Sequence, residues 1–159
     1  MSQETVQIGE KELEALRNDA RLHPLKRARI NLHRSPEDKI QEMVIAVCKR
    51  SYIGPHRQRN KEKSYVLIEG EMMVAFFDDS GKCTRKIRMM KRERGTDPVV
   101  YRFPSGEWHT VVSLSELVVY IEIAPGPYRP EETEFANWGP NPKNALQQET
   151  FLASLERGI

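Results

Sequence analysis

Two histidines in the middle of the chain lie in the surroundings best suited to chemistry. His56 directly follows Gly54 and Pro55, and His109 closes the segment Pro104-Ser105-Gly106-Glu107-Trp108-His109. Both follow stiff turns of small residues, in a part of the chain patterned as β-strands. Strands that are distant in sequence can bring two imidazoles into one pocket of a small barrel, and imidazole nitrogens are common metal ligands. The pair therefore predicts a pocket that could bind a metal.

The residues that follow His56 decide what else could reach this pocket. Side chains alternate along a strand, so Gln58 should point into the barrel with His56, whereas Arg57 should point away. By the same rule Glu62 and Lys63 lie on opposite faces, and Glu62 could turn inward only at a bulge.

Composition indicates one soluble domain. The 159 residues carry a net charge of only +2, which does not favour a nucleic-acid partner. Basic residues gather at 85–94, but Glu93 interrupts them and no exposed aromatics accompany them, so we interpret them as a solvated hairpin face. The two cysteines, Cys48 and Cys83, form no CxxC unit and indicate reduced thiols. Without a signal peptide or a long apolar run, we expect a cytoplasmic protein with no membrane contact.

The first fifty residues predict a helix, a strand and a second helix. Apolar residues spaced by three and four predict a helix over 9–22, and alternation predicts a strand over 27–33. Ser35 followed by Pro36 and two acids resembles a helix start, which favours a helix over 36–48. A strand is the alternative for that segment, because residues 44–47 are β-compatible.

The rest of the chain predicts a β-barrel or sandwich followed by a loop and a short helix. Short apolar runs, separated by turns rich in Gly, Pro and Asp, predict strands at 65–68, 72–77, 82–90, 99–103 and 117–123. A proline-rich loop covers 129–144, and a terminal helix covers 149–155. We therefore divide one globular unit into an N-terminal segment (1–50), a barrel (51–128) and a C-terminal loop and helix (129–159).

These motifs resemble the cupin superfamily, a mostly β jelly-roll barrel. Pro104 to His109 matches the second cupin motif, Pro-x-Gly-x-x-His, at every defined position, and Pro55, His56 and Gly70 match part of the first. Over residues 13–155 the chain looks like WbuC-type cupin fold metalloproteins, which accompany bacterial surface-polysaccharide genes. The segments that carry this likeness are 29–33, 51–57, 77–81, 126–128 and 138–140.

The chain departs from the cupin pattern at three positions. Gln58 replaces the second histidine of the first motif, Lys63 holds the position of its glutamate, and Asn141 stands where relatives tend to be acidic. Two functional interpretations of the pocket follow, beside the alternative that the two histidines are hydrogen-bonded inside the barrel and have no function. In one, His56, Gln58 and His109, with Glu62 and waters, bind Zn, Fe, Mn or Ni. In the other no metal binds, and Lys63 supplies the positive charge that holds an anionic ligand or a pocket carboxylate.

The resemblance implies a protein that acts on a small molecule related to a sugar or sugar nucleotide. An enzyme would be a metal-assisted isomerase, or less plausibly a dioxygenase, with Lys63 or Glu62 in acid–base roles. The alternative is a non-catalytic, metal-free binding or regulatory module on the same scaffold. Glu122 could be either a solvent-facing residue or a pocket acid. An open barrel leaves strand edges that need cover, so we expect a homodimer.

Overall fold

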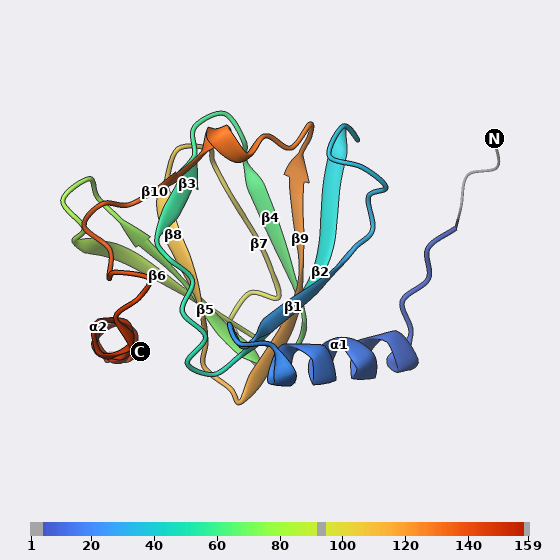
Figure 1. Cartoon of the computed structure of the whole chain (residues 1–159), viewed down its shortest axis with the longest axis horizontal. Coiled ribbons are helices and arrows are strands. Elements are labelled where there is room, and N and C mark those ends of the chain that lie inside the picture. The colour runs from blue at the N-terminus through green and yellow to red at the C-terminus, as the bar shows by residue number, and fades with distance from the viewer. Residues whose placement is uncertain (1–4, 92–94, 158–159) are drawn as a thin grey trace.

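Two five-stranded antiparallel sheets face each other and enclose most of the apolar side chains (Figure 1). The computed structural model describes residues 5–91 and 95–157. The strands of the first sheet lie in the order β1 (Arg27–Asn31), β2 (Ile40–Cys48), β9 (Leu117–Pro125), β4 (Lys63–Glu69), β7 (Val100–Phe103). Those of the second sheet lie in the order β10 (Thr133–Phe135), β3 (His56–Gln58), β8 (Trp108–Ser113), β5 (Glu71–Phe77), β6 (Cys83–Met90). The chain passes repeatedly between the sheets, and the predicted mostly β jelly-roll fold is confirmed.

Alternation along the strands builds the core between the sheets. In β4, for example, Lys63, Tyr65 and Leu67 are buried while the residues between them are only partly so. The inner core consists of large apolar and aromatic residues from both sheets: Val47, Tyr65, Leu67, Met72, Val74, Phe76, Met89, Phe103, Val111, Val118 and Tyr120. This packing fixes the strands that position the candidate site.

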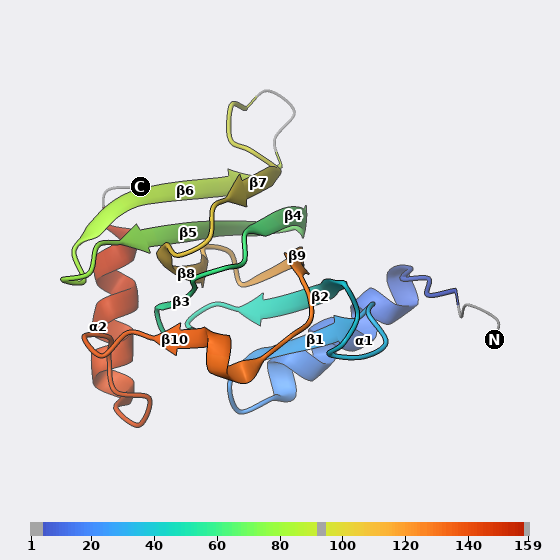
Figure 2. The same cartoon turned by 90° about the horizontal axis from the view of Figure 1, so that it is seen from above.

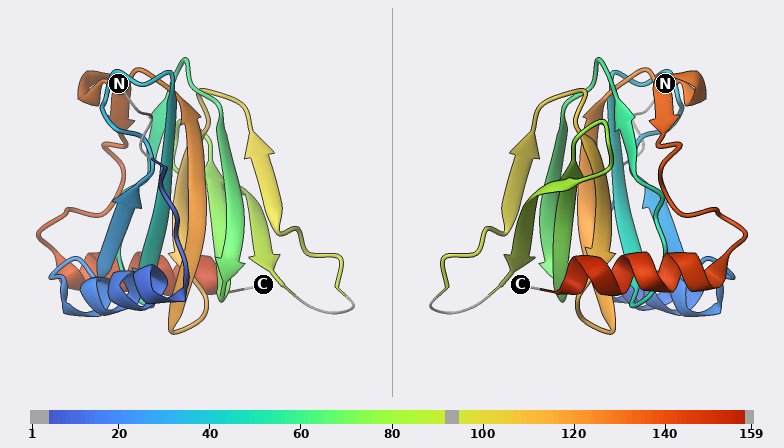
Figure 3. Two further views of the ribbon diagram at one scale, coloured as in Figure 1. Left: turned by 90° about the vertical axis from the view of Figure 1, so that its right-hand side faces the viewer. Right: turned by 90° about the vertical axis from the view of Figure 1, so that its left-hand side faces the viewer.

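A helix covers the outer face of each sheet. α1 (Glu10–Leu22) packs Leu16 and Ala20 against the outward residues of β2, and Arg17 forms a bidentate pair with Glu69 of β4 at 2.7 and 2.9 Å. α2 (Ala145–Glu156) packs its buried leucines against β5 and β8. Both helices lie toward the same end of the sheets, and the edge strands β1 and β10 lie on the same side (Figures 2 and 3). Within the described residues, neither helix combines the length and apolar character needed to cross a membrane.

The predicted helix over 36–48 is wrong, because residues 40–48 form strand β2. β2 is paired on both sides, with β1 and β9, and its second half is buried on both faces because α1 covers the outside. A strand that is buried on both faces has apolar residues at successive positions. Such a run also contains apolar residues spaced by three and four, the pattern of a helix face. The hydroxyl of Ser35 accepts from the backbone N–H of Glu37 at 3.2 Å, so the capping signal builds a turn instead. β1 and β2 are strands of the first sheet, and the barrel thus begins at Arg27.

Two further differences concern the C-terminal part and the basic segment. The loop predicted for 129–144 contains a short 3-10 helix (η1, Pro130–Glu132) and β10, and α2 begins four residues earlier than predicted, with Asn144 as its cap. On β6, Arg85 pairs with Glu107 and Arg88 with Glu71, as expected of a solvated hairpin face. Residues 92–94 of the basic segment lie outside the described residues.

Candidate functional site

The two histidines meet inside the barrel. His56 in β3 and His109 in β8 are direct partners across the two strands, and their ring centroids lie 4.5 Å apart. The Pro104–His109 turn is tied to β3, because the N–H of Gly106 donates to the carbonyl of Gln58 at 2.8 Å. Gly106 has a φ of +85°, a conformation that glycine adopts without strain. The motif that ends at His109 thus places its imidazole against His56.

Backbone carbonyls orient both rings. The carbonyl of Gly54 lies 3.0 Å from Nδ1 of His56, and that of Glu107 lies 2.9 Å from Nδ1 of His109. A carbonyl oxygen can only accept, so each Nδ1 carries the hydrogen and each Nε2 keeps its lone pair. His109 is only 1% exposed, and its Nε2 finds no hydrogen-bond partner within the described residues. The site therefore contains a buried acceptor that the described residues leave without a partner, on a ring that is packed between His56 and Phe103 and does not itself line the cavity.

Both imidazoles are neutral near pH 7. Burial lowers the pKa of His56 to about 4, and the nearby charge of Lys63 contributes in the same direction. Burial also lowers the pKa of His109 well below its usual value, with further contributions from His56 and Lys63. Two uncharged proton acceptors thus lie side by side.

Lys63 lies beside the histidines, in the interior of the barrel. It is only 5% exposed, and its Nζ lies 3.1 Å from an oxygen of Glu122 and 3.4 Å from Nε2 of His56. Glu122 reaches it from β9, the strand next to β4. Glu122 is therefore a pocket acid, and its carboxylate compensates the buried ammonium.

Of the remaining predicted site residues, Gln58 points into the barrel and Glu62 lies on its surface. Gln58 is buried and points inward, but its amide donates to Thr133 Oγ1 of β10 at 3.1 Å. The structure contradicts a pocket role for Glu62, whose side chain is 51% exposed and pairs with Arg102 at 2.5 Å. No bulge rotates Glu62 inward, so strand alternation turns it to the surface beside the buried Lys63.

A cavity of about 1180 Å³ opens from this site to the surface. Its inner end is lined by His56, Lys63 and Glu122, together with the tyrosines Tyr65 and Tyr120. Burial, followed by the charge of Glu122, raises the pKa of both tyrosines, so their hydroxyls stay protonated. The mouth lies between β1 and β10, where the lining residues Arg29, Tyr128 and Phe135 are exposed.

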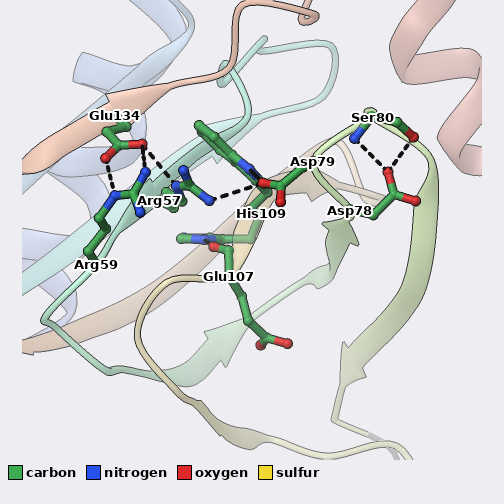
Figure 4. Close-up of polar contacts among 9 residues, drawn as sticks. Arg57, Arg59, Asp78, Asp79, Ser80, Glu107, His109 and Glu134 are labelled. Atoms are coloured by element: carbon green, nitrogen blue, oxygen red, sulfur yellow. Dashed lines mark hydrogen bonds and ion pairs between the residues drawn. The ribbon is translucent and has the colours of Figure 1, made fainter.

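The outer face of β3 carries a separate polar network. Arg57 stacks on Trp108 with 4.1 Å between guanidinium and ring centroid, and it bonds Glu134 at 2.9 Å and Asp79 at 3.2 Å. Figure 4 shows Arg57 and Arg59 converging on Glu134, with Asp79 on the other side of Arg57. Arg57 thus points away from the cavity, as predicted, and its guanidinium is engaged by acids of this chain.

The donor set in this arrangement does not fit a divalent metal. Among the residues that the structure describes, no three His, Cys, Asp or Glu side chains are placed to hold one ion. Neutral imidazoles can ligate a metal, but the amide of Gln58, the third predicted ligand, is bonded to Thr133. A dication at His56 Nε2 would also lie next to the ammonium of Lys63, which repels it.

Known structures share the fold at low sequence identity. Protein SO0799 from Shewanella oneidensis matches with a TM-score of 0.58 and 10% identity, over 74% of this chain and 82% of that chain. CapF, solved with the inhibitor 3-isopropenyl-tropolone, matches with a TM-score of 0.51 and 18% identity, over 67% of this chain and 31% of that chain. The cupin domain of Schizosaccharomyces pombe Cnp3 matches with a TM-score of 0.48 and 14% identity, over 64% of this chain and 65% of that chain. The matches to SO0799 and CapF, with TM-scores above 0.5 at 10% and 18% identity, show a shared fold and nothing about function.

Sequence comparison places the chain in a family. Curated protein sequences give no match. A family match covers residues 8–89, which include His56, Gln58 and Lys63 and end before His109. Because this match spans more than half of the sequence, the chain belongs to the family described as a domain of unknown function, DUF6016.

Proposed function

We propose that the barrel binds a small polar molecule at His56, His109 and Lys63 without a metal ion. The observation that carries this proposal is the position of the Lys63 ammonium, 3.1 Å from Glu122 and 3.4 Å from His56 Nε2. The amino group of Lys63 thus lies between an imidazole and a carboxylate, the donor types that a transition metal would use. In this proposal the positive charge of the pocket comes from the Lys63 side chain and not from a bound metal ion.

The free acceptor on His109 supports a ligand that donates hydrogen bonds. A buried polar atom without a partner costs about 1–3 kcal/mol, and a ligand hydroxyl could donate to it. The same hydroxyl, or a neighbouring one, could accept from Lys63. Polyhydroxylated molecules offer such groups in pairs, which agrees with the sugar or sugar-nucleotide metabolite of surface-polysaccharide metabolism that the likeness to WbuC-type proteins implies.

The second candidate function is a metal-independent isomerase. It is favoured by two neutral imidazoles beside Lys63, whose Nζ lies 3.4 Å from Nε2 of His56, while Nε2 of His109 has no partner within the described residues. Lys63 would polarise the carbonyl oxygen of a 2-hydroxy aldehyde, and an imidazole Nε2 would take the proton from the hydroxyl-bearing carbon and deliver it to the former carbonyl carbon. The proton of the hydroxyl group would pass to the former carbonyl oxygen, which leaves a 1-hydroxy ketone. Lys63 would then be the electrophile, while Glu62 on the surface takes no part. A dioxygenase needs a redox metal, which this donor set does not fit.

Two expectations accompany the proposal. We expect a reducing, cytoplasmic setting, because Cys48 and Cys83 are both free thiols. We also expect a homodimer that covers the unpaired edges of β1 and β10, the outermost strands on the side of the cavity mouth. Light scattering at micromolar concentration tests the dimer, and a monomer would remove it.

Metal analysis and ligand binding test the proposal together. Full-length protein purified without a histidine tag should hold well under 0.1 equivalent of transition metal after incubation with zinc and dialysis. Ligand-observed NMR should detect members of a panel of hexoses, sugar acids, sugar phosphates and nucleoside-diphosphate sugars. His109→Ala should abolish these signals, and Arg57→Ala, on the outer face, should keep them. One equivalent of metal that disappears in His56→Ala, or binding unaffected by His109→Ala, would refute it.

A further inference from the structure

The inner face of β1 lines the cavity with arginines. Alternation turns Ala28 and Ile30 toward α1, whereas Arg27 and Arg29 face the cavity. Arg27, His56 and Tyr120 line the same cavity. One chamber thus connects the guanidinium of Arg27 with the imidazole of His56.

The positive charges of this chamber exceed the negative ones. The charged side chains of the lining are Arg27, Arg29, Arg34, Lys61 and Lys63 against Asp19 and Glu122. Glu122 is paired with Lys63, and Lys61 bonds Glu132 at 2.6 Å and also the carbonyl of Pro127. Throughout residues 5–91 and 95–157, no carboxylate lies within ion-pair distance of Arg27 or Arg29.

Arg27 has most of its donors available. Its Nη1 donates to the carbonyl of Tyr52 at 2.6 Å, and this is its one hydrogen bond to the described part of the chain. A guanidinium has five N–H donors in a planar fork that matches a carboxylate or a phosphate. Partial burial removes water from this group and lowers its pKa, so an anion would restore a lost interaction.

We propose that the mouth of the cavity contains an oxyanion subsite, in which Arg27, assisted by Arg29, binds a carboxylate or phosphate of the ligand. This inference rests on the proposed function and specifies its ligand as a small polyhydroxylated anion, such as a sugar acid or a sugar phosphate. The charged end lies at Arg27, and the hydroxylated end lies at His56 and Lys63, next to the ring of His109. The cavity volume of about 1180 Å³ accommodates such a molecule.

Calorimetric titration of the full-length protein with three probes tests the ligand class. The probes are D-glucuronate, glucose 1-phosphate and neutral methyl glucoside, at one ionic strength. At least one anionic probe should bind 10-fold or more tightly than the neutral one, and the stronger of the two identifies carboxylate or phosphate. Arg27→Gln should remove this advantage, Arg27→Lys should keep part of it, and Arg57→Gln, the outward control, should keep all of it. Equal affinity for charged and neutral probes, or an unchanged advantage in Arg27→Gln, overturns the inference.

Inorganic phosphate separates this inference from the proposed function. Phosphate should raise the melting temperature of the wild type above that in chloride of equal ionic strength. It should do the same in His109→Ala, which lacks the inner acceptor, and in Arg57→Gln, but not in Arg27→Gln. If His109→Ala loses sugar binding but keeps the phosphate effect, both proposals stand. A phosphate effect without His109-dependent sugar binding leaves the subsite and removes the proposed function. A phosphate effect of equal size in Arg27→Gln is non-specific and refutes the subsite.

Discussion

The inner end of the cavity and its mouth differ in whether their basic side chains have acidic partners. At the inner end the ammonium of Lys63 is compensated by Glu122, and the two histidines are neutral. At the mouth Arg27 and Arg29 have no acidic partner among the residues the structure covers. A deeply buried ion needs a partner from the protein, because desolvation would otherwise cost several kcal/mol. Arg29 is exposed to solvent, and Arg27 is only partly buried and keeps a hydrogen bond to the carbonyl of Tyr52, so both can remain without an acidic partner until a ligand arrives. The difference indicates that the inner end is organised by the fold and that the mouth selects the ligand.

Removing the negative charge of the inner end should have the largest effect. Glu122→Gln leaves the ammonium of Lys63 buried without a counter-ion, so we expect a loss of about 3–5 kcal/mol in the free energy of unfolding. Urea denaturation followed by fluorescence measures this loss.

The double variant Lys63→Met/Glu122→Gln is the matched control. It removes both charges and keeps similar side-chain volumes, so it should lie within about 1 kcal/mol of the wild type. If Glu122→Gln alone proves neutral, the ammonium must be solvated or deprotonated, and the inner end is not charge-balanced as described.

Reversing the charge of residue 63 should create a metal site. In Lys63→Glu a carboxylate replaces the ammonium beside His56 and His109, which completes two imidazoles and one carboxylate. We expect about one equivalent of zinc by elemental analysis. Zinc at 100 times its Kd should stabilise this variant by about 2.7 kcal/mol. Adding His109→Ala should abolish both effects, and metal in the wild type at the same level would contradict the role assigned to Lys63.

The neutral histidines should make stability depend on pH. Their folded pKa values lie below the unfolded value of 6.5, with that of His56 at about 4, so the unfolded chain binds more protons in the interval between. Their contribution is fully present above pH 6.5 and is lost as the pH falls through about 4. Each proton adds a slope of about 1.4 kcal/mol per pH unit. Unfolding measured at pH 7, 6 and 5 tests this, and the double variant His56→Gln/His109→Gln should show a flatter profile.

The sequence predicts the strands and the meeting of the two histidines better than it predicts the charge balance around them. The turn before each histidine is a local feature, and together with the cupin-like motifs it predicts that His56 and His109 share a pocket. Strand β8, which carries His109, is not among the strands predicted from periodicity. Alternation predicts that Lys63 and Glu62 lie on opposite faces, but only the structure shows that Lys63 is the buried one and that Glu62 is exposed. The helix predicted for 36–48 fails because α1, a distant segment, covers β2 from outside.

The partners of the inward residues depend on sheet order, which a single sequence does not reveal. Glu122 reaches Lys63 because β9 lies between β2 and β4. Thr133 engages Gln58 because a three-residue strand, β10, pairs with β3 from within a proline-rich segment. Arg27 and Arg29 could be recognised as inward-facing once 27–33 is taken as a strand, but a cavity in front of them follows only from the barrel.

A substitution on the outer face of β3 should have the smallest effect on stability. It tests whether residues outside the cavity influence ligand binding at its inner end and mouth. Arg57 pairs with Glu134 and with the exposed Asp79, where water and salt screen ion pairs, and it stacks on Trp108. Arg57→Ala should therefore cost about 1–2 kcal/mol, mainly through lost packing on the indole. Part of this cost should disappear at 0.5 M salt in denaturation experiments, and probe affinity should not change. A fall in probe affinity as large as that in Arg27→Gln would mean that the outer network shapes the cavity, and the contrast between the inner and outer faces of β3 would then no longer hold.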